Sequence, residues 1–219
     1  MTMVETQEKT CTAFAGLKMI ATGDLKHVAQ ITKKTLDGGE KEFVLIFDDK
    51  TAQPIEVDFR GSTKDVLLRI EGSQKAASLA MQPAAPESKG VETTTNAAKG
   101  DESRGPGRPK LGVVAREVTL LPRHWDWLNS QPGGASVALR KLVDEARHAN
   151  SGKDAIRQSQ EAAYRFMSAL AGNLPGFEES ARALFAGDEK KFRELTGSWP
   201  EDVGRYALKL ATDALQQRG

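Results

Sequence analysis

Residues 75–103 (KAASLAMQPAAPESKGVETTTNAAKGDES) divide this chain, because they carry almost no large apolar side chains and show neither helical nor strand periodicity. Alanine, proline, serine, threonine and glycine dominate the stretch. A segment of this composition cannot bury enough apolar surface to offset the conformational entropy that it would lose on ordering. We therefore expect a disordered linker at 75–103, with folded parts before and after it.

The part before the linker, residues 11–74, predicts a small α+β module with the element order ββαββα. Phe43–Asp48 is an almost continuous apolar run, which is typical of a strand buried on both faces. Pro54–Phe59 alternates apolar and polar residues, as a half-buried strand does. The full set expected is strands at Thr12–Gly16 and Lys18–Ala21, a helix at Asp24–Leu36, strands at Phe43–Asp48 and Pro54–Phe59, and a helix capped by Ser62 with Asp65 in the capping-box position.

The C-terminal part, residues 151–219, predicts an all-helical domain. Its apolar residues recur at helical spacing, and such regular stripes indicate a buried core rather than a functional site. Gly197 ends one of the expected helices, and Pro200 suits the first turn of the next. The stripes are Ala162 or Ala163, Phe166, Met167 and Leu170; Phe177, Ala181, Leu184 and Phe185; Phe192 and Leu195; and Val203, Tyr206 or Ala207, Leu210, Ala211 and Ala214. With the N-terminal module, the fold class is α+β.

The segment between linker and C-terminal domain, residues 104–150, is the basic part of the chain. It holds 8 Lys+Arg against 4 Asp+Glu, whereas the whole protein has a formal net charge of only +1. Alternation in Arg116–Leu121 predicts a strand, and Pro122 starts a helix with apolar residues on one face. A Pro-Gly-Gly turn follows, and Ser136 is placed to cap a second helix. This unit has too little core to be stable alone, so we expect a second copy to pair with it strand to strand.

This strand–helix–helix pattern resembles the ribbon–helix–helix family of dimeric DNA-binding proteins. The matching residues are Val118-Thr119-Leu120-Leu121-Pro122, Gly134-Ala135-Ser136 and Ala138-Leu139-Arg140-Lys141-Leu142-Val143. The resemblance implies a homodimer whose paired strands lie in the DNA major groove. By position it implies base or backbone contacts from Arg116 and Thr119, and a phosphate held by the backbone N–H groups around Ala135 and Ser136.

The segment departs from that family in two ways. One residue is missing between Leu120 and Leu121, so the outward face of the strand is left open. The first helix is short and carries Trp125 and Trp127. The alternative interpretation is that this strand, helix and helix are an ordinary part of the C-terminal core.

A short basic arm precedes the strand. Gly107-Arg108-Pro109-Lys110, with Arg104 upstream, resembles the core of an AT-hook, which lies in the minor groove of A·T-rich DNA. The narrow groove there has a negative potential that attracts a guanidinium, and proline keeps the arm extended. The residues that these two resemblances assign to DNA binding are Arg104, Arg108, Pro109, Lys110, Arg116, Thr119, Ala135 and Ser136. A solvated linker would have the same composition and is the alternative.

The full sequence also resembles a family of uncharacterised bacterial proteins that share the FVLIFDD and GRPKLGVVAREVTLLPRHWDWL stretches. This resemblance implies a bacterial, cytosolic setting and no particular activity.

Several function classes lack support in the sequence. The single cysteine excludes an internal disulfide framework and a Cys-based zinc site. The three histidines have no metal-site spacing, and we find no catalytic motif and no motif for a cofactor. No apolar run is long enough to span a membrane, and residues 1–11 lack the features of a signal peptide, so we expect a cytoplasmic protein.

We therefore expect a DNA-binding protein, either a dimeric transcriptional regulator or a nucleoid-type binder. A protein-interaction or scaffold protein without nucleic-acid activity is the second hypothesis. An enzyme that uses the N-terminal α+β module, in which Asp48-Asp49 ends a strand, is the third.

Overall fold

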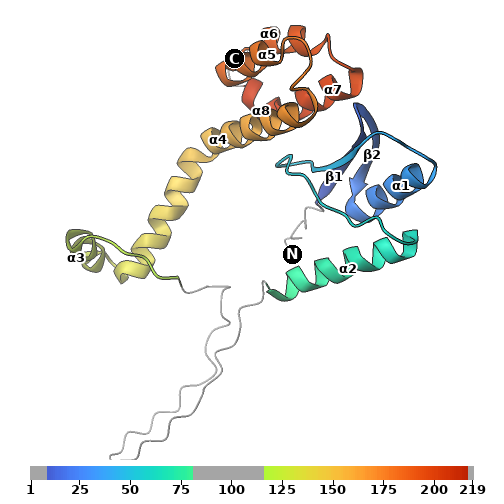
Figure 1. Cartoon of the computed structure of the whole chain (residues 1–219). Helices are drawn as coiled ribbons and strands as arrows, with labels where there is room; N and C mark the ends of the chain where they lie inside the picture. Colours follow the sequence, from blue (N-terminus) through green and yellow to red (C-terminus); the bar gives the residue numbers. More distant parts are fainter. Residues whose placement is uncertain (1–8, 81–115, 217–219) are drawn as a thin grey trace, which may run out of the picture. The chain divides into compact units, whose positions relative to one another are not determined.

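The computed structural model describes residues 9–80 and 116–216 (Figure 1). They form an α+β protein, in which a small antiparallel sheet near the N-terminus is followed by a mostly helical C-terminal region. The predicted fold class is confirmed.

The sheet has three strands in the order β2-β1-β3, and both pairings are antiparallel. The strands are β1 (Thr10–Ala15), β2 (Lys18–Asp24) and β3 (Val44–Asp48). Gly16 makes the tight turn between β1 and β2 at φ 55°, and its N–H donates to the carbonyl of Phe43 at 2.9 Å. The central strand β1 is buried on both faces, because neighbouring strands cover its edges and helices cover its sides.

Helix α1 (Leu25–Asp37) follows the sheet's edge strand without a loop. The Asp24 carboxylate caps it by accepting hydrogen bonds from the N–H groups of Lys26 and His27 at 3.0 and 3.1 Å. Its buried residues pack toward the sheet and toward the next helix. The helix expected at Asp24–Leu36 is therefore present with nearly the same ends.

The strand expected at Pro54–Phe59 is not formed. Only an isolated bridge between Phe47 and Pro54, and a hydrogen bond of 2.7 Å from the Ile55 N–H to the Ile46 carbonyl, join this segment to β3. Proline has no N–H to donate to a ladder.

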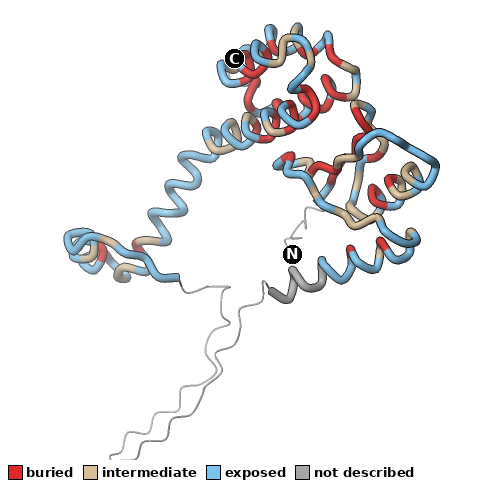
Figure 2. The backbone as a smooth tube through the Cα atoms, viewed as in Figure 1, coloured by how far each residue is buried: buried red, intermediate tan, exposed pale blue. Residues whose placement is uncertain are grey.

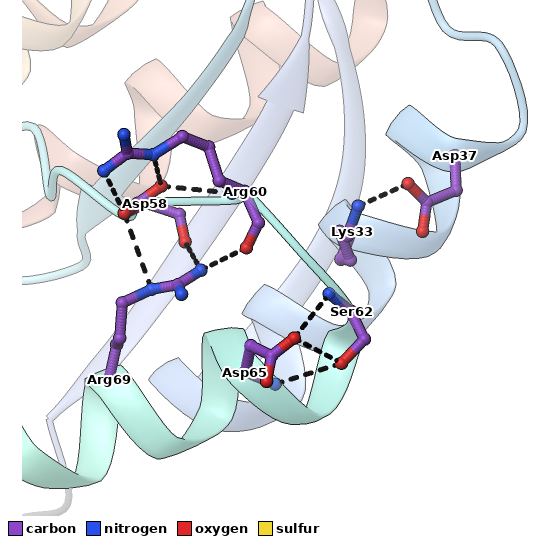
Figure 3. Close-up of polar contacts among 7 residues, drawn as sticks. All are labelled: Lys33, Asp37, Asp58, Arg60, Ser62, Asp65 and Arg69. Atoms are coloured by element: carbon purple, nitrogen blue, oxygen red, sulfur yellow. Dashed lines mark hydrogen bonds and ion pairs between the residues drawn. The ribbon is translucent and has the colours of Figure 1, made fainter.

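Arginine side chains hold the backbone that follows. Arg69 donates to the carbonyl of Asp58 at 2.8 Å and to that of Arg60, and the Arg60 guanidinium lies 2.8 Å from the Asp58 carboxylate (Figure 3). Hydrogen bonds from Arg60 hold the pKa of Asp58 well below its usual range. The Asp58 carbonyl, which a strand at Pro54–Phe59 would offer to a neighbouring strand, is thus bonded to a side chain, and the strand predicted there is wrong.

Helix α2 (Thr63–Ala80) begins with the predicted capping box. The Ser62 N–H donates to the Asp65 carboxylate at 2.8 Å, and the Asp65 N–H donates to the Ser62 hydroxyl at 3.3 Å (Figure 3). The helix continues over 75–80, so this part of the expected linker is helical. The rest of that linker, 81–103, lies outside the described residues.

The C-terminal region is helical, as predicted. Its longest helix, α4, is followed by short helices that end in turns at Gly187 and Gly197. Most of the predicted stripes are buried, but Phe185 is 52% exposed. The helices are α4 (Gly134–Leu170), α5 (Phe177–Ala186), α6 (Glu189–Thr196), α7 (Glu201–Leu210) and α8 (Thr212–Leu215).

Helix α4 crosses the boundary that we expected at residue 150. The second helix of the central segment and the first helix of the C-terminal region are one continuous element. Residues 9–73 and 139–216 belong to one compact unit, and residues between 74 and 138 belong to another.

The N-terminal sheet and the C-terminal helices share one hydrophobic core, so they are not two separate cores as the sequence suggested. Phe14 and Phe47 from the sheet contact Phe166 of α4, with ring centroids 5.3 Å apart in both pairs. Tyr206 of α7 lies 4.7 Å from Phe166 and 5.4 Å from Phe14. All four rings are at most 1% exposed. In Figure 2, the second half of α4 and the helices after it contain many of the buried residues.

Candidate nucleic-acid interface

Residues Arg116–Leu121 form no strand in this single chain, so the predicted strand is not observed here. An isolated strand has no ladder to satisfy its backbone groups. Arg116 and Thr119, the two predicted DNA contacts, are both exposed. The ribbon would pair two chains, and it stays a prediction.

Helix α3 (Pro122–Ser130) is the first helix of the predicted unit. Pro122 stands at its first position, where a missing N–H costs nothing. Leu128 is 3% exposed, but Trp127 is 51% exposed. A helix of nine residues with one buried side chain depends on further packing for its stability.

The turn between α3 and α4 uses two glycines in left-handed conformations. Gly133 has φ 86° and Gly134 has φ 75°. A Cβ on Gly133 would lie 3.1 Å from the Val137 side chain, so the turn needs glycine for both its conformation and its space.

Helix α4 begins at Gly134, two residues before the predicted cap Ser136. Ala135 and Ser136 therefore lie in the first helical turn, and the prediction that Ser136 is the N-cap is wrong. Their placement still suits phosphate, because the first-turn N–H groups of a helix point outward and the helix dipole favours an anion there. The other predicted contacts, Arg104, Arg108, Pro109 and Lys110, lie outside the described residues.

Large apolar side chains are exposed along this part of the sequence. Six of them fall between residues 118 and 143, each 42–54% exposed. We call them the apolar set: Val118, Leu121, Trp127, Val137, Leu142 and Val143. Single exposed apolar residues are ordinary, and these six are grouped by their nearness in the sequence.

A second polar site, which the sequence reading missed, centres on Asp49 in the folded unit. Its carboxylate accepts hydrogen bonds from the Thr12 hydroxyl at 2.6 Å and from the Tyr206 phenol at 2.9 Å. Lys209 Nζ donates to the other carboxylate oxygen at 2.9 Å. We call these residues the Asp49 cluster, which also includes Thr22, whose hydroxyl lies 3.0 Å from that of Thr12.

Charge and burial in the Asp49 cluster shift the pKa values of Asp49 and Tyr206 in opposite directions. Burial disfavours the charged carboxylate, but hydrogen bonds from Thr12, Lys209 and Tyr206 outweigh it, so the pKa of Asp49 is lowered. Burial, followed by the charge of Asp49, raises the pKa of Tyr206 well above its usual range. A phenol kept neutral beside a carboxylate kept charged suits structural hydrogen bonding, and it links β3 to α7. The signal in the sequence was the pair Asp48-Asp49 at a strand end.

The described residues, 9–80 and 116–216, contain neither a metal-binding cluster nor a membrane-spanning helix. No group of three or more His, Cys, Asp or Glu there is arranged to hold a metal ion. None of the helices in this part of the chain is both long and apolar enough to cross a membrane.

These features define an α+β protein with a three-stranded sheet and a helical C-terminal region. The chain belongs to a family described as uncharacterized proteins conserved in bacteria (DUF2239), whose model matches residues 10–211. The expected membership of an uncharacterised bacterial family is thus confirmed. No curated protein and no solved structure matches the chain.

Proposed function

We propose that this protein binds DNA as a dimer, either as a transcriptional regulator or as a nucleoid-type binder. The observation that supports the proposal most directly is the apolar set, which is exposed within the same stretch that carries the predicted DNA contacts. Covering it needs a partner, and a second copy of the same stretch offers matching side chains.

A second copy also supplies what the strand lacks. Among the described residues of one chain, residues 116–121 have no partner strand. Antiparallel pairing between two copies would satisfy their backbone groups and present Thr119, and the side chains in phase with it, to a DNA groove. Arg116 at the start of the strand and the first turn of α4 then provide charge and phosphate contacts.

The first experiment titrates the full-length protein onto labelled duplex DNA at several salt concentrations. We expect log affinity to fall linearly with log salt, with a slope of about −0.9 for each phosphate neutralised. Arg116→Ala should make the slope shallower by about one unit, because it removes one phosphate or base contact. Arg182→Ala is the matched control, since it removes an exposed arginine on α5 that pairs with Glu179. An absence of binding at low salt contradicts the proposal.

The basic arm has its own test. We expect Arg108→Ala to weaken binding to A·T-rich duplexes more than to G·C-rich ones, because its guanidinium is proposed to lie in the narrow A·T minor groove. The measurement is the affinity ratio for the two duplexes at one salt concentration. An equal loss on both would reduce the arm to a nonspecific electrostatic tether.

The runner-up function is a protein-interaction or scaffold role, favoured by the exposed Trp127 and the near-neutral net charge. Tryptophan is enriched at the centres of protein interfaces. Sedimentation of the full chain, combined with the DNA titration, distinguishes the DNA-binding protein from the interaction protein. A monomer at micromolar concentration would remove the ribbon, whereas a dimer without DNA affinity would favour the interaction protein.

A further inference from the structure

We propose that Asn150-Ser151-Gly152 is a hinge inside α4, at which the helix breaks and reforms in solution. The inference is independent of DNA binding, because it uses only the composition, hydrogen bonds and burial of this helix.

The first argument is local sequence. Asn150, Ser151 and Gly152 are consecutive residues of low helix propensity, and Gly152 is the one glycine of α4 beyond its first residue. Asparagine and serine compete with the helix by bonding to nearby backbone groups, and glycine gains the most entropy when the helix opens. Neighbouring serine and glycine are a recognised place for helices to kink.

The second argument is that side chains here bond to the carbonyls of the preceding turn. Asn150 Nδ2 donates to the Ala146 carbonyl at 2.9 Å, and the Ser151 hydroxyl donates to the His148 carbonyl at 3.0 Å. The His148 Nδ1 lies 2.7 Å from the Asp144 carbonyl. These carbonyls would also accept the main-chain bonds of the helix, so each side chain offers the backbone an alternative partner when the main-chain bond opens.

The third argument is the lack of tertiary support. Every residue from 140 to 153 is exposed, and burial in α4 becomes regular only from Ser159 onward (Figure 2). Helix stability in proteins comes mainly from packing of an apolar face, so an unpacked stretch depends on its own propensity. The triplet with the weakest propensity lies near the end of this unpacked stretch.

The ion pairs of α4 are grouped on the two sides of the triplet. Lys141–Glu145 and Arg147–Asp144 precede it, each at 4.0 Å. Arg157 pairs with Asp154 at 3.0 Å and with Glu161 at 3.9 Å after it. Both flanks therefore keep their own helical support when the triplet opens, which makes a hinge rather than general fraying the expected motion.

The test measures distances along α4 in the full-length protein. Spin labels at Ala146→Cys and Ala169→Cys lie on opposite sides of the triplet, and a continuous helix would separate them by about 35 Å. We expect a broad distance distribution extending to shorter values. Adding Asn150→Ala, Ser151→Ala and Gly152→Ala should narrow it to about 35 Å and slow amide exchange around the triplet on the order of tenfold.

Controls keep the result interpretable. The native Cys11 is 1% exposed and should stay unlabelled, which mass spectrometry checks. Dilution with unlabelled protein removes distances between copies. Ser168→Ala removes an exposed serine whose hydroxyl donates to the Tyr164 carbonyl four residues earlier, as the Asn150 side chain does to Ala146. Ser168 lies in the packed half of α4, so this change should leave the distribution broad. A narrow distribution near 35 Å in the protein without the alanine triplet would overturn the hinge, as would a triplet that changes neither distance nor exchange.

Discussion

Single residues explain how a sheet of only three strands is fixed to helices far along the chain. Asp49 lies 157 positions from Tyr206 and 160 from Lys209, yet all three meet in the Asp49 cluster. The Asp49 side chain is 11% exposed, so its charge needs these donors. The local sequence around Asp49 does not predict these partners, because Tyr206 and Lys209 come from α7, near the other end of the chain. This part of the structure was therefore out of reach of sequence reasoning.

We expect Tyr206→Phe to lower the free energy of unfolding by about 1.5 kcal/mol at neutral pH, because a buried hydrogen bond to a charged group is lost. The raised pKa of Tyr206 has a further consequence. Its stabilisation is present below the pKa of the unfolded phenol, near 10, and is lost as pH rises, because only the unfolded state then releases the proton.

Urea unfolding at several pH values tests both expectations. The alkaline decline in stability should be smaller in Tyr206→Phe than in the unsubstituted protein. Tyr164→Phe is the matched control, because Tyr164 is 42% exposed and its loss should change stability at neutral pH by less than about 0.5 kcal/mol. Identical alkaline declines in the Tyr206→Phe variant and the unsubstituted protein would contradict the role given to the phenol.

At the level of elements, periodicity predicted the helices and strands correctly where the local sequence determines them. It failed where contacts with distant residues determine the structure. The strand β3 and the apolar face of α7 were visible in the sequence and are present. The prediction that Phe43–Asp48 is buried on both faces is wrong, because β3 is an edge strand in which only Ile46 and Phe47 are buried, and Phe43 is 58% exposed. Residues 54–59 alternate as a strand does, but Arg69 from the following helix takes two of the nearby carbonyls. The boundary placed between residues 150 and 151 does not separate two elements, because α4 runs through it.

The turn before α4 gives a prediction at this scale. Gly133→Ala forces a side chain into a left-handed conformation and against Val137. We expect Gly133→Ala to destabilise the turn between α3 and α4 by about 1–2 kcal/mol. The measurement is amide hydrogen exchange in the first turn of α4, which should become faster. Gly72→Ala is the control, because its helical position in α2 has open space and a Cβ there should stabilise by about 0.5–1 kcal/mol. Unchanged exchange in Gly133→Ala would contradict the geometry of the turn.

At the scale of the whole molecule, the compact unit of residues 9–73 and 139–216 is held together by a core that draws on both ends of the sequence. Phe14 and Phe47 come from the sheet, and Phe166 and Tyr206 come from the helices. Sequence reading placed a divide at residues 75–103 and expected an independent module on each side. Residues 75–103 separate two parts of the chain but not two parts of the core, because the apolar faces on the two sides pack against each other. Patterns indicate which faces are apolar but not which faces meet.

If the chain is cut between residues 80 and 116, the two fragments should therefore stay associated. We expect a protease site inserted in that interval to yield two fragments that co-elute in size-exclusion chromatography and unfold together in urea, because separation would expose all four aromatic rings. Either fragment expressed alone should be unfolded or aggregated. The control is the same inserted sequence left uncut. Separate elution of two folded fragments would contradict the shared core.

The shared core also orders events during synthesis. A ribosome releases the sheet first, but the ring cluster of Phe14, Phe47, Phe166 and Tyr206 is complete only after Tyr206 has left the exit tunnel. Until then, the early strands present aromatic surface and unpaired edges to solvent, which is the condition that favours aggregation. A nascent chain stalled before α7 is thus expected to engage chaperones, and the completed chain to release them.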